Sequence, residues 1–264
     1  MNLRNAAIIM KKDIDEMIKT RYVLMTLIMV PLIFSIVLPV SLTQGIGSTS
    51  NNTTVEDLAK MGIKPVEGMS PTQQMFGFLI NNMMFLFFII PLAAPSVIGS
   101  YSMVGEKLNK SLEPLLATPA EDGDIMAGKV LASVVPSVAA TILAFALFVV
   151  VVNVQASSLL GSLFLPGPAW LIAVLLVSPA LCFLSTILTL ILSSRMNDIR
   201  SVQQISAMLV MPIMGIFVLS MTGVNLSSPL FMLSLFAIVA AIDGALFKAA
   251  KKLFQREEIL TKWK

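Results

Sequence analysis

One polar stretch decides how the chain is organised. It reads Gly105-Glu-Lys-Leu-Asn-Lys-Ser-Leu-Glu-Pro-Leu-Leu-Ala-Thr-Pro-Ala-Glu-Asp-Gly-Asp-Ile-Met-Ala-Gly-Lys129, with five acidic and three basic residues. Long apolar blocks precede and follow it. Charged side chains are costly in hydrocarbon and irregular backbone cannot face lipid, so an insert of this size must lie in water. This central stretch (residues 105–129) is therefore predicted to be a loop between two membrane spans.

The composition is that of a membrane protein. Only 12% of the 264 residues are charged and the mean hydropathy is +0.89, whereas soluble domains carry about 25% charged residues. The chain has no histidine, and its one cysteine is Cys182. These counts exclude an intrachain disulfide and a Cys/His metal site, and they remove most hydrolytic and proton-shuttle chemistry. The basic residues cluster at the edges of the apolar blocks, so they are topology signals rather than a nucleic-acid patch.

Six apolar blocks have the length of transmembrane helices, because about 20 helical residues cross the hydrocarbon core. We expect an all-α polytopic membrane protein, with one transmembrane domain over residues 1–264. Ser70-Pro71-Thr72-Gln73 is a capping-box start for the second span, and Ser228 caps the sixth. Prolines inside the first two spans predict kinks at Pro31, Pro39, Pro91 and Pro95. The expected spans are residues 22–42, 71–101, 130–152, 168–192, 202–221 and 229–247.

An amphipathic helix is predicted before the first span, over residues 3–19. Apolar residues recur at helical spacing while charged residues fill the other face. An ordinary soluble amphipathic helix would have the same pattern. The span that starts three residues later favours a helix in the membrane interface.

The remaining connections are polar or uncharged. Residues 43–70 form a polar loop with a short helix near 54–61, and Asn51 and Asn52 each begin an Asn-x-Thr glycosylation pattern, although an unmodified loop is the favoured interpretation. We expect a short uncharged loop at 153–167 and a basic tail at 248–264.

The orientation follows from the distribution of lysine and arginine. If the N-terminus is inside, sixteen of the eighteen basic residues lie inside and only Lys60 and Lys64 lie outside. The positive-inside rule then puts both termini and the central stretch in the cytoplasm, in a multi-pass protein of the plasma membrane.

The central stretch contains two helix-start signals. Ser111 can cap a short helix over residues 112–117, and Thr118-Pro119-Ala120-Glu121 begins a helix that leads into span three. The result is a helix-turn-helix that presents leucines to water, which a partner, the bilayer surface or the protein's own spans must cover. The residues alone leave these alternatives open.

The motif Gly-Glu-Lys-x-x-x-Ser-Leu-Glu-Pro-Leu-Leu-Ala-Thr-Pro, followed by Gly-Lys-Val-Leu, resembles the ABC type-2 exporter permease family. Ser111 stands where the family usually has threonine, and Leu108 where a second acid is common. The tail from Leu253 to Lys264 is similar to that of the sodium-exporter-type branch.

This resemblance implies a membrane permease subunit that moves a substrate out of the cytoplasm. It implies a second permease copy, or a homologous permease, and a separate cytosolic ABC ATPase that binds ATP and Mg, with no cofactor or catalytic residue on this chain. The central stretch would be the cytosolic coupling segment that docks the ATPase. The residues that match the motif there are Glu106, Leu112, Glu113, Leu115, Leu116, Thr118 and Pro119; Glu106 would form salt bridges with the ATPase or with the amphipathic helix.

One further motif is a decoy. Gly123 to Val130 matches a phosphate-binding loop except at its last position, where Val130 replaces the Ser or Thr that holds magnesium. A phosphate-binding loop also follows a buried strand, whereas this segment opens a membrane helix. We therefore expect no nucleotide site on this chain.

Three polar residues inside the spans are candidates for a substrate path: Asn81, Asn82 and Asp243. For the asparagines, hydrogen bonding between helices is the favoured interpretation. For Asp243, a place near the inner headgroups or in helix pairing is favoured, because Lys248 follows closely. Small residues from Ser133 to Ala144 at four-residue spacing favour close helix packing. A secondary transporter coupled to ions is the alternative function; loss of transport with intact ATP hydrolysis on neutralising Asp243 would favour it. A membrane-embedded enzyme is disfavoured because the spans contain no histidine and no facing acids.

Overall fold

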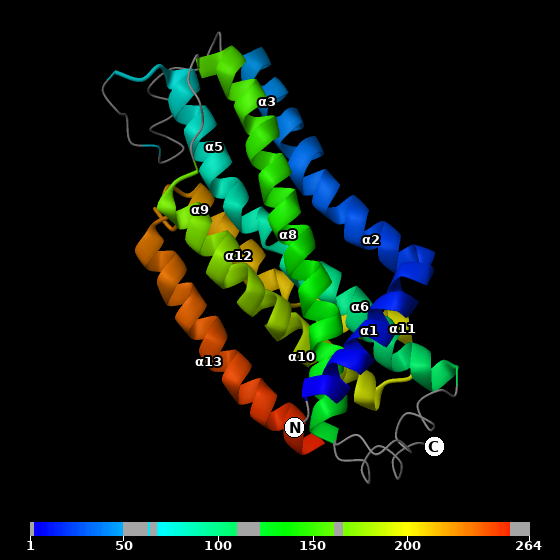
Figure 1. The fold of residues 1–264 in the computed structure, drawn as a ribbon. Helices are drawn as coiled ribbons and strands as arrows, with labels where there is room; N and C mark the ends of the chain where they lie inside the picture. Colours follow the sequence, from blue (N-terminus) through cyan, green and yellow to red (C-terminus); the bar gives the residue numbers. More distant parts are fainter. Residues whose placement is uncertain (1–2, 50–62, 64–67, 110–121, 161–165, 254–264) are drawn as a thin grey trace.

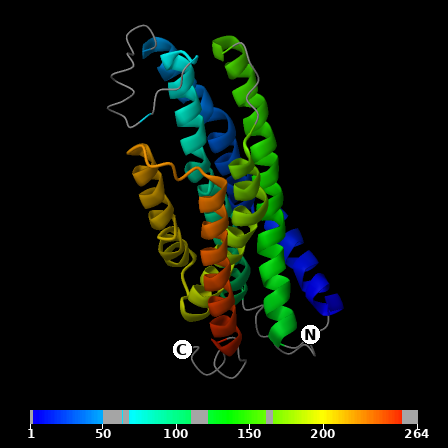
Figure 2. The ribbon, with the colours of Figure 1, turned by 90° about the vertical axis from the view of Figure 1, so that its left-hand side faces the viewer.

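The computed structural model describes residues 3–49, 63, 68–109, 122–160 and 166–253 (Figure 1). In these ranges the chain is helical and has no strand, which confirms the all-α fold. Helices of these ranges that are long and apolar enough to cross a membrane run over Arg21–Gly45, Pro71–Leu108, Gly123–Ser157, Pro168–Arg195, Ile199–Met221 and Pro229–Ala250. They lie side by side along one axis (Figure 1, Figure 2). The six predicted membrane-crossing helices are therefore present.

Helix α1 (Leu3–Lys19) lies obliquely across one end of this bundle (Figure 1). Its buried face consists of Ala6, Ile9, Asp13 and Met17, which recur every three or four residues and bring one side of α1 onto the bundle. Its most extensive packing is against α8 (Asp122–Leu160). We call this the α1 end of the bundle, and the opposite end, where α5 begins, the far end.

Span one consists of α2 (Arg21–Leu32), a π-helical turn (Ile33–Val37) and α3 (Leu38–Thr49). The π turn lies between the two prolines that predicted a kink, and Pro39 there cannot donate a backbone hydrogen bond. Residues 43–49, which we expected in a loop, continue the helix instead. Thr43 explains this extension, since its hydroxyl donates to Gln155 Oε1 of α8 at 2.6 Å.

Span two is broken into α5 (Pro71–Phe87) and α6 (Ile89–Leu108). The predicted capping box is present, with Gln73 N donating to Ser70 Oγ at 3.3 Å and Ser70 N donating to Gln73 Oε1 at 3.0 Å. The break at Phe88 precedes Pro91, whose missing N–H leaves the carbonyl of Phe87 without a helical donor. The expected helix end at residue 101 is wrong: α6 runs on to Leu108, so the first residues of the central stretch are helical.

Helix α8 makes up span three and is much longer than the predicted 130–152. Residues 122–129 are helical, in agreement with the helix that was predicted to lead from Thr118-Pro119-Ala120-Glu121 into span three. Residues 153–160, assigned to the next connection, are helical against expectation. Neither glycine nor proline occurs between residues 137 and 160, and the Asn153 amide donates to Val149 O at 2.8 Å within the helix. At about 1.5 Å per residue the 39 residues of α8 extend about 58 Å, which is well beyond a bilayer core of about 30 Å.

The last three spans follow the predicted order. Span four consists of α9, a π turn and α10, span five consists of α11 and α12, and span six is α13. Asp198 caps α11, with Ser201 N donating to its carboxylate at 2.9 Å. The bounds are Pro168–Ile172, Ala173–Val177, Ser178–Arg195, Ile199–Ala207, Val210–Met221 and Pro229–Leu253.

The core surrounds span two. Most of span two is buried inside the bundle. Most of spans one, three, five and six is not buried there, as suits helices that face lipid. Trp170 anchors the core beside span two, stacked on Phe148 and Phe145 with ring centroids 5.0 and 5.6 Å away and edge-on to Phe87. Span two is thus the central span of the bundle.

Candidate functional site

Four charged side chains from three helices form a closed network at the α1 end. Glu106 of α6 accepts from Lys12 of α1 through Oε1 at 2.5 Å and pairs with Lys129 of α8 through Oε2 at 2.7 Å. Asp13 of α1 closes the circle, with Oδ2 3.3 Å from Lys129 Nζ and Oδ1 3.7 Å from Lys12 Nζ. We call these four residues the ion-pair ring. Its two cations and two anions balance.

Ser102 ties the ring further to α6. Its hydroxyl donates to Asp13 Oδ2 at 2.6 Å, and Lys129 Nζ donates to Ser102 Oγ at 2.9 Å. Lys129 is fully buried, Asp13 and Glu106 are nearly so, and the Lys12 side chain is 38% exposed. The ring is therefore an internal joint between α1, α6 and α8 rather than a surface ion pair.

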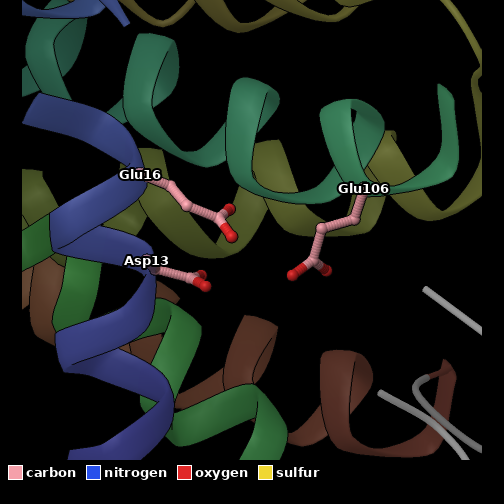
Figure 3. A group of neighbouring side chains, drawn as sticks. All are labelled: Asp13, Glu16 and Glu106. Carbon is pink, nitrogen blue, oxygen red and sulfur yellow. The ribbon is translucent and has the colours of Figure 1, made fainter. Parts of the chain in front are cut away.

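A third carboxylate, that of Glu16, stands at the rim of the ring. The carboxylates of Asp13, Glu16 and Glu106 face one another across the space between α1 and α6, with ligand atoms within 4.8 Å of one another (Figure 3). Such a group resembles a cation site. However, the Lys12 ammonium lies 2.5 Å from Glu106 and 3.5 Å from Glu16. The positive charge of this lysine therefore already pairs with these carboxylates.

The surroundings of Lys12 favour its charged form. Partial burial opposes the charged form of Lys12, but its hydrogen bond to Glu106 and the charges of Glu106, Asp13 and Glu16 outweigh this and raise the pKa of Lys12 above its usual value. Removing one partner of a buried ion pair leaves an uncompensated charge, which costs about 3–5 kcal/mol. The ring therefore holds its three helices together as long as all four members are present.

Gly128 explains how α1 comes close enough to α8 to form the ring. A Cβ atom at this position would lie 2.8 Å from Cβ and Cγ2 of Ile9 and 2.9 Å from the carbonyl oxygen of Ala6. Only glycine allows this approach. The adjacent pair Gly128-Lys129, which made the sequence look like a phosphate-binding loop, thus lies within α8, where the glycine admits α1 and the lysine pairs with Asp13 and Glu106.

The position of the ring relative to the central stretch gives it functional interest. Glu106 lies near the start of that stretch and Lys129 is its last residue. The ring therefore joins the two ends of the central stretch to each other and to α1. The other residues inferred to dock the ATPase lie outside the described residues. They are Leu112, Glu113, Leu115, Leu116, Thr118 and Pro119.

A cavity of about 400 Å³ opens beside the ring between α1 and α6. Asp13, Glu16 and Glu106 line it together with Tyr101, whose ring centroid lies 5.6 Å from that of Tyr22. The cavity gives solvent and partners access to the exposed side of the ring.

The predicted path residues Asn81 and Asn82 line a second cavity, at the far end, of about 480 Å³. Asn82 is 3% exposed; its amide donates to Phe78 O at 2.9 Å and its Oδ1 accepts a hydrogen bond from Ser220 of α12. Asn81 is exposed. We call this the far-end cavity; its other polar lining residues are Ser220, Asn225 and Ser227.

Asp243, the third predicted path residue, lies elsewhere. It is on α13, is 6% exposed, and does not line the far-end cavity. Its Oδ1 is buried and has no hydrogen-bond partner within the part of the chain that the structure describes. The structure thus brings Asn81 and Asn82 together with Ser220 but leaves Asp243 apart.

Sequence reasoning missed most of the ring. It placed Lys12 and Asp13 on the solvated face of an amphipathic helix, and it considered Lys129 only as part of the decoy. Asp13 carried a detectable signal, because it shares the three-to-four-residue spacing of Ala6, Ile9 and Met17 and so lies on the buried face of α1.

The long apolar helices define a multi-pass integral membrane protein. At one end of the bundle, a buried network of ion pairs links the two ends of the polar insert to the spans. The chain belongs to the ABC-2 transporter family: the family model described as ABC-2 family transporter protein matches residues 7–247. This range includes the ring, the central stretch, the first five spans and most of span six. Comparison with individual curated proteins gave no match.

Proposed function

We propose that this chain is the permease subunit of an ATP-binding-cassette exporter, driven by ATP hydrolysis on separate ATPase subunits. One observation carries the proposal: the ion-pair ring connects both ends of the central stretch to α1 and to spans two and three. A force applied to the central stretch is thereby delivered to these helices together. Membership of the ABC-2 transporter family supports the same conclusion.

In the proposed arrangement the α1 end faces the cytoplasm, as the distribution of basic residues favours. The ATPase docks on Leu112, Glu113, Leu115, Leu116, Thr118 and Pro119, and a second copy of the chain or a homologous permease completes the transporter. ATP binding changes the contact between ATPase and permease, and only such a difference in contact can shift the permease between inward- and outward-facing states. ATP and Mg bind to the ATPase.

The far-end cavity is the proposed outer part of the substrate path. Asn81, Asn82 and Ser220 supply neutral hydrogen-bonding groups there, between α5 and α12. On the resemblance of the tail at 253–264, which lies outside the described residues, we further propose the sodium-exporter-type branch. Coupling to an ion without any ATPase is the alternative function, and the buried, unpartnered oxygen of Asp243 is the observation that favours it.

Co-purification in mild detergent tests the proposal. The chain is tagged and isolated from its own cells, and accompanying proteins are identified by mass spectrometry. We expect an ABC ATPase with the unchanged chain and its loss with Leu115→Asp plus Leu116→Asp. Leu108→Asp is the matched control, since Leu108 is an exposed leucine at the end of α6 outside the docking set. Absence of any ATPase from the unchanged chain would refute the proposal.

A further inference from the structure

Lys107, which follows Glu106 in α6, makes contacts of a different kind. Its ammonium donates to three backbone carbonyls at the end of α10: Ser193 O at 2.5 Å, Ser194 O at 3.0 Å and Met196 O at 3.3 Å. Lys107 is 7% exposed, and among the described residues no carboxylate forms a salt bridge with it. All three donors of the ammonium therefore serve one helix terminus.

The chemistry of a helix end accounts for this choice of partner. The last carbonyls of an α-helix have no donor within the helix, and the aligned peptide dipoles place partial negative charge there. A buried ammonium satisfies both conditions, and the carbonyls in turn compensate its charge. Lys107 of span two thus caps the C-terminus of α10 in span four, and it joins the end of α6 to the end of α10.

The adjacent residues Glu106 and Lys107 of α6 consequently bind different helices. Successive side chains point about 100° apart around a helix of 3.6 residues per turn. Glu106 points to α1 and α8 through the ion-pair ring, whereas Lys107 points to α10. The end of α6, which contains the first residues of the central stretch, is therefore fastened on two sides.

Further polar contacts continue from α10 to span five. Thr189 Oγ1 of α10 lies 3.0 Å from Ser206 Oγ of α11, and Gln203 of α11 donates to Ser100 Oγ of α6 at 3.1 Å. Beyond α11, the chain continues into α12, which carries Ser220 at the far-end cavity.

We propose that Lys107 is a positioning residue that transmits displacement of the central stretch to spans four and five, through its bonds to the C-terminal carbonyls of α10. The ring contains residues of α1, α6 and α8 and none of α10, whereas Lys107 bonds the end of α6 directly to the end of α10. Helices α6 and α10 also pack extensively against each other, and Gln203 joins α11 to α6. Loss of Lys107 would therefore weaken, rather than abolish, the transmission of displacement from the α6 end to the link at Met196–Asp198. This inference rests on the proposed function, because an ATPase must supply the displacement.

Hydrogen–deuterium exchange on the permease–ATPase complex in lipid nanodiscs tests the proposal, with and without a non-hydrolysable ATP analogue. Peptides covering residues 189–203 report on the link, and peptides covering residues 122–135 report on α8. In the unchanged complex we expect the analogue to alter exchange at both. In Lys107→Met the response at the link is reduced while that of α8, ATPase binding and ATP hydrolysis persist. Lys107→Arg, which keeps the charge and several donors, restores part of the link response.

The matched control is Arg195→Met, which removes a positive charge from the same end of α10. Arg195 is exposed and so should leave the link response intact. If Lys107→Met does not fold, Lys107→Gln takes its place, because its amide keeps two donors, and a reduced response is expected.

The outcomes separate the two proposals. A full link response in the folded Lys107 variant, or a link that ignores the ATP analogue in the unchanged complex, overturns the role of Lys107 and leaves the permease function standing. Failure of the unchanged chain to bind any ATPase overturns the proposed function and this inference with it.

Discussion

Glu106 shows how much a single residue contributes to this protein. Each of its carboxylate oxygens is held by a different lysine, one from α1 and one from α8. A glutamate that serves two helices cannot be replaced by a neutral residue without leaving Lys129 buried and undercompensated.

We therefore expect Glu106→Gln to lower stability by about 3–5 kcal/mol, the usual cost of breaking a buried ion pair. The measurement is thermal denaturation in detergent, in which the midpoint should fall clearly. Glu16→Gln is the matched control. The Glu16 side chain is 56% exposed and lies 3.5 Å from the Lys12 ammonium, so loss of its charge should cost about 1 kcal/mol or less. Equal midpoints for the two variants would show that the ring does not hold the helices.

The contact of α1 with α8 belongs to the scale of elements. It depends on one position without a side chain, Gly128, against which Ala6 and Ile9 pack. Interfaces between membrane helices commonly use small residues in this way, because close approach of two backbones gains packing where no hydrophobic driving force exists.

Gly128→Ala should detach α1 from the bundle, since the added Cβ would overlap Ile9 and the Ala6 carbonyl. Limited trypsin digestion reads this out, because trypsin cleaves segments that unfold locally and a detached α1 offers Lys11, Lys12 and Lys19 for cleavage. Gly105→Ala is the control, as nothing lies within 4 Å of a Cβ there, and alanine favours a helix interior over glycine by about 0.5–1 kcal/mol. Unchanged digestion of the Gly128 variant would contradict the proposed packing.

The elements were predictable in number and order because membrane spans leave a strong signal in hydropathy. Their ends were not. Three helical segments were not predicted, because they are polar or lie beyond the length a bilayer requires: residues 43–49, 105–108 and 153–160. Partners outside the local sequence hold them, as Gln155 holds Thr43.

The candidate site was predictable only in part, for a related reason. Glu106 stood out through its motif, and Asn81 and Asn82 through their polarity within a span. The amphipathic helix was one of the two partners predicted for Glu106, and the contact with Lys12 confirms it. The individual lysines were not predicted, because nothing near Lys12 or Lys129 in the chain indicates that they meet Glu106. Contacts that join residues 94 positions apart, as Lys12 and Glu106 are, arise from packing rather than from local pattern.

At the scale of the whole molecule, the proposed mechanism is that of a lever. We propose that the central stretch receives force from the ATPase, that the ion-pair ring and Lys107 distribute it among the spans, and that the far-end cavity opens or closes as α12 moves against α5. The exposed apolar faces of spans one, three, five and six leave room for lipid and for a second permease.

The most direct test of the central claim is ATP hydrolysis by the purified complex. We predict that the unchanged chain, isolated in mild detergent from its own cells, brings with it an activity that hydrolyses ATP, and that Leu115→Asp plus Leu116→Asp abolishes this activity while the permease elutes as a folded, monodisperse species. A folded, monodisperse preparation of the unchanged chain that hydrolyses no ATP and contains no second polypeptide would contradict the account.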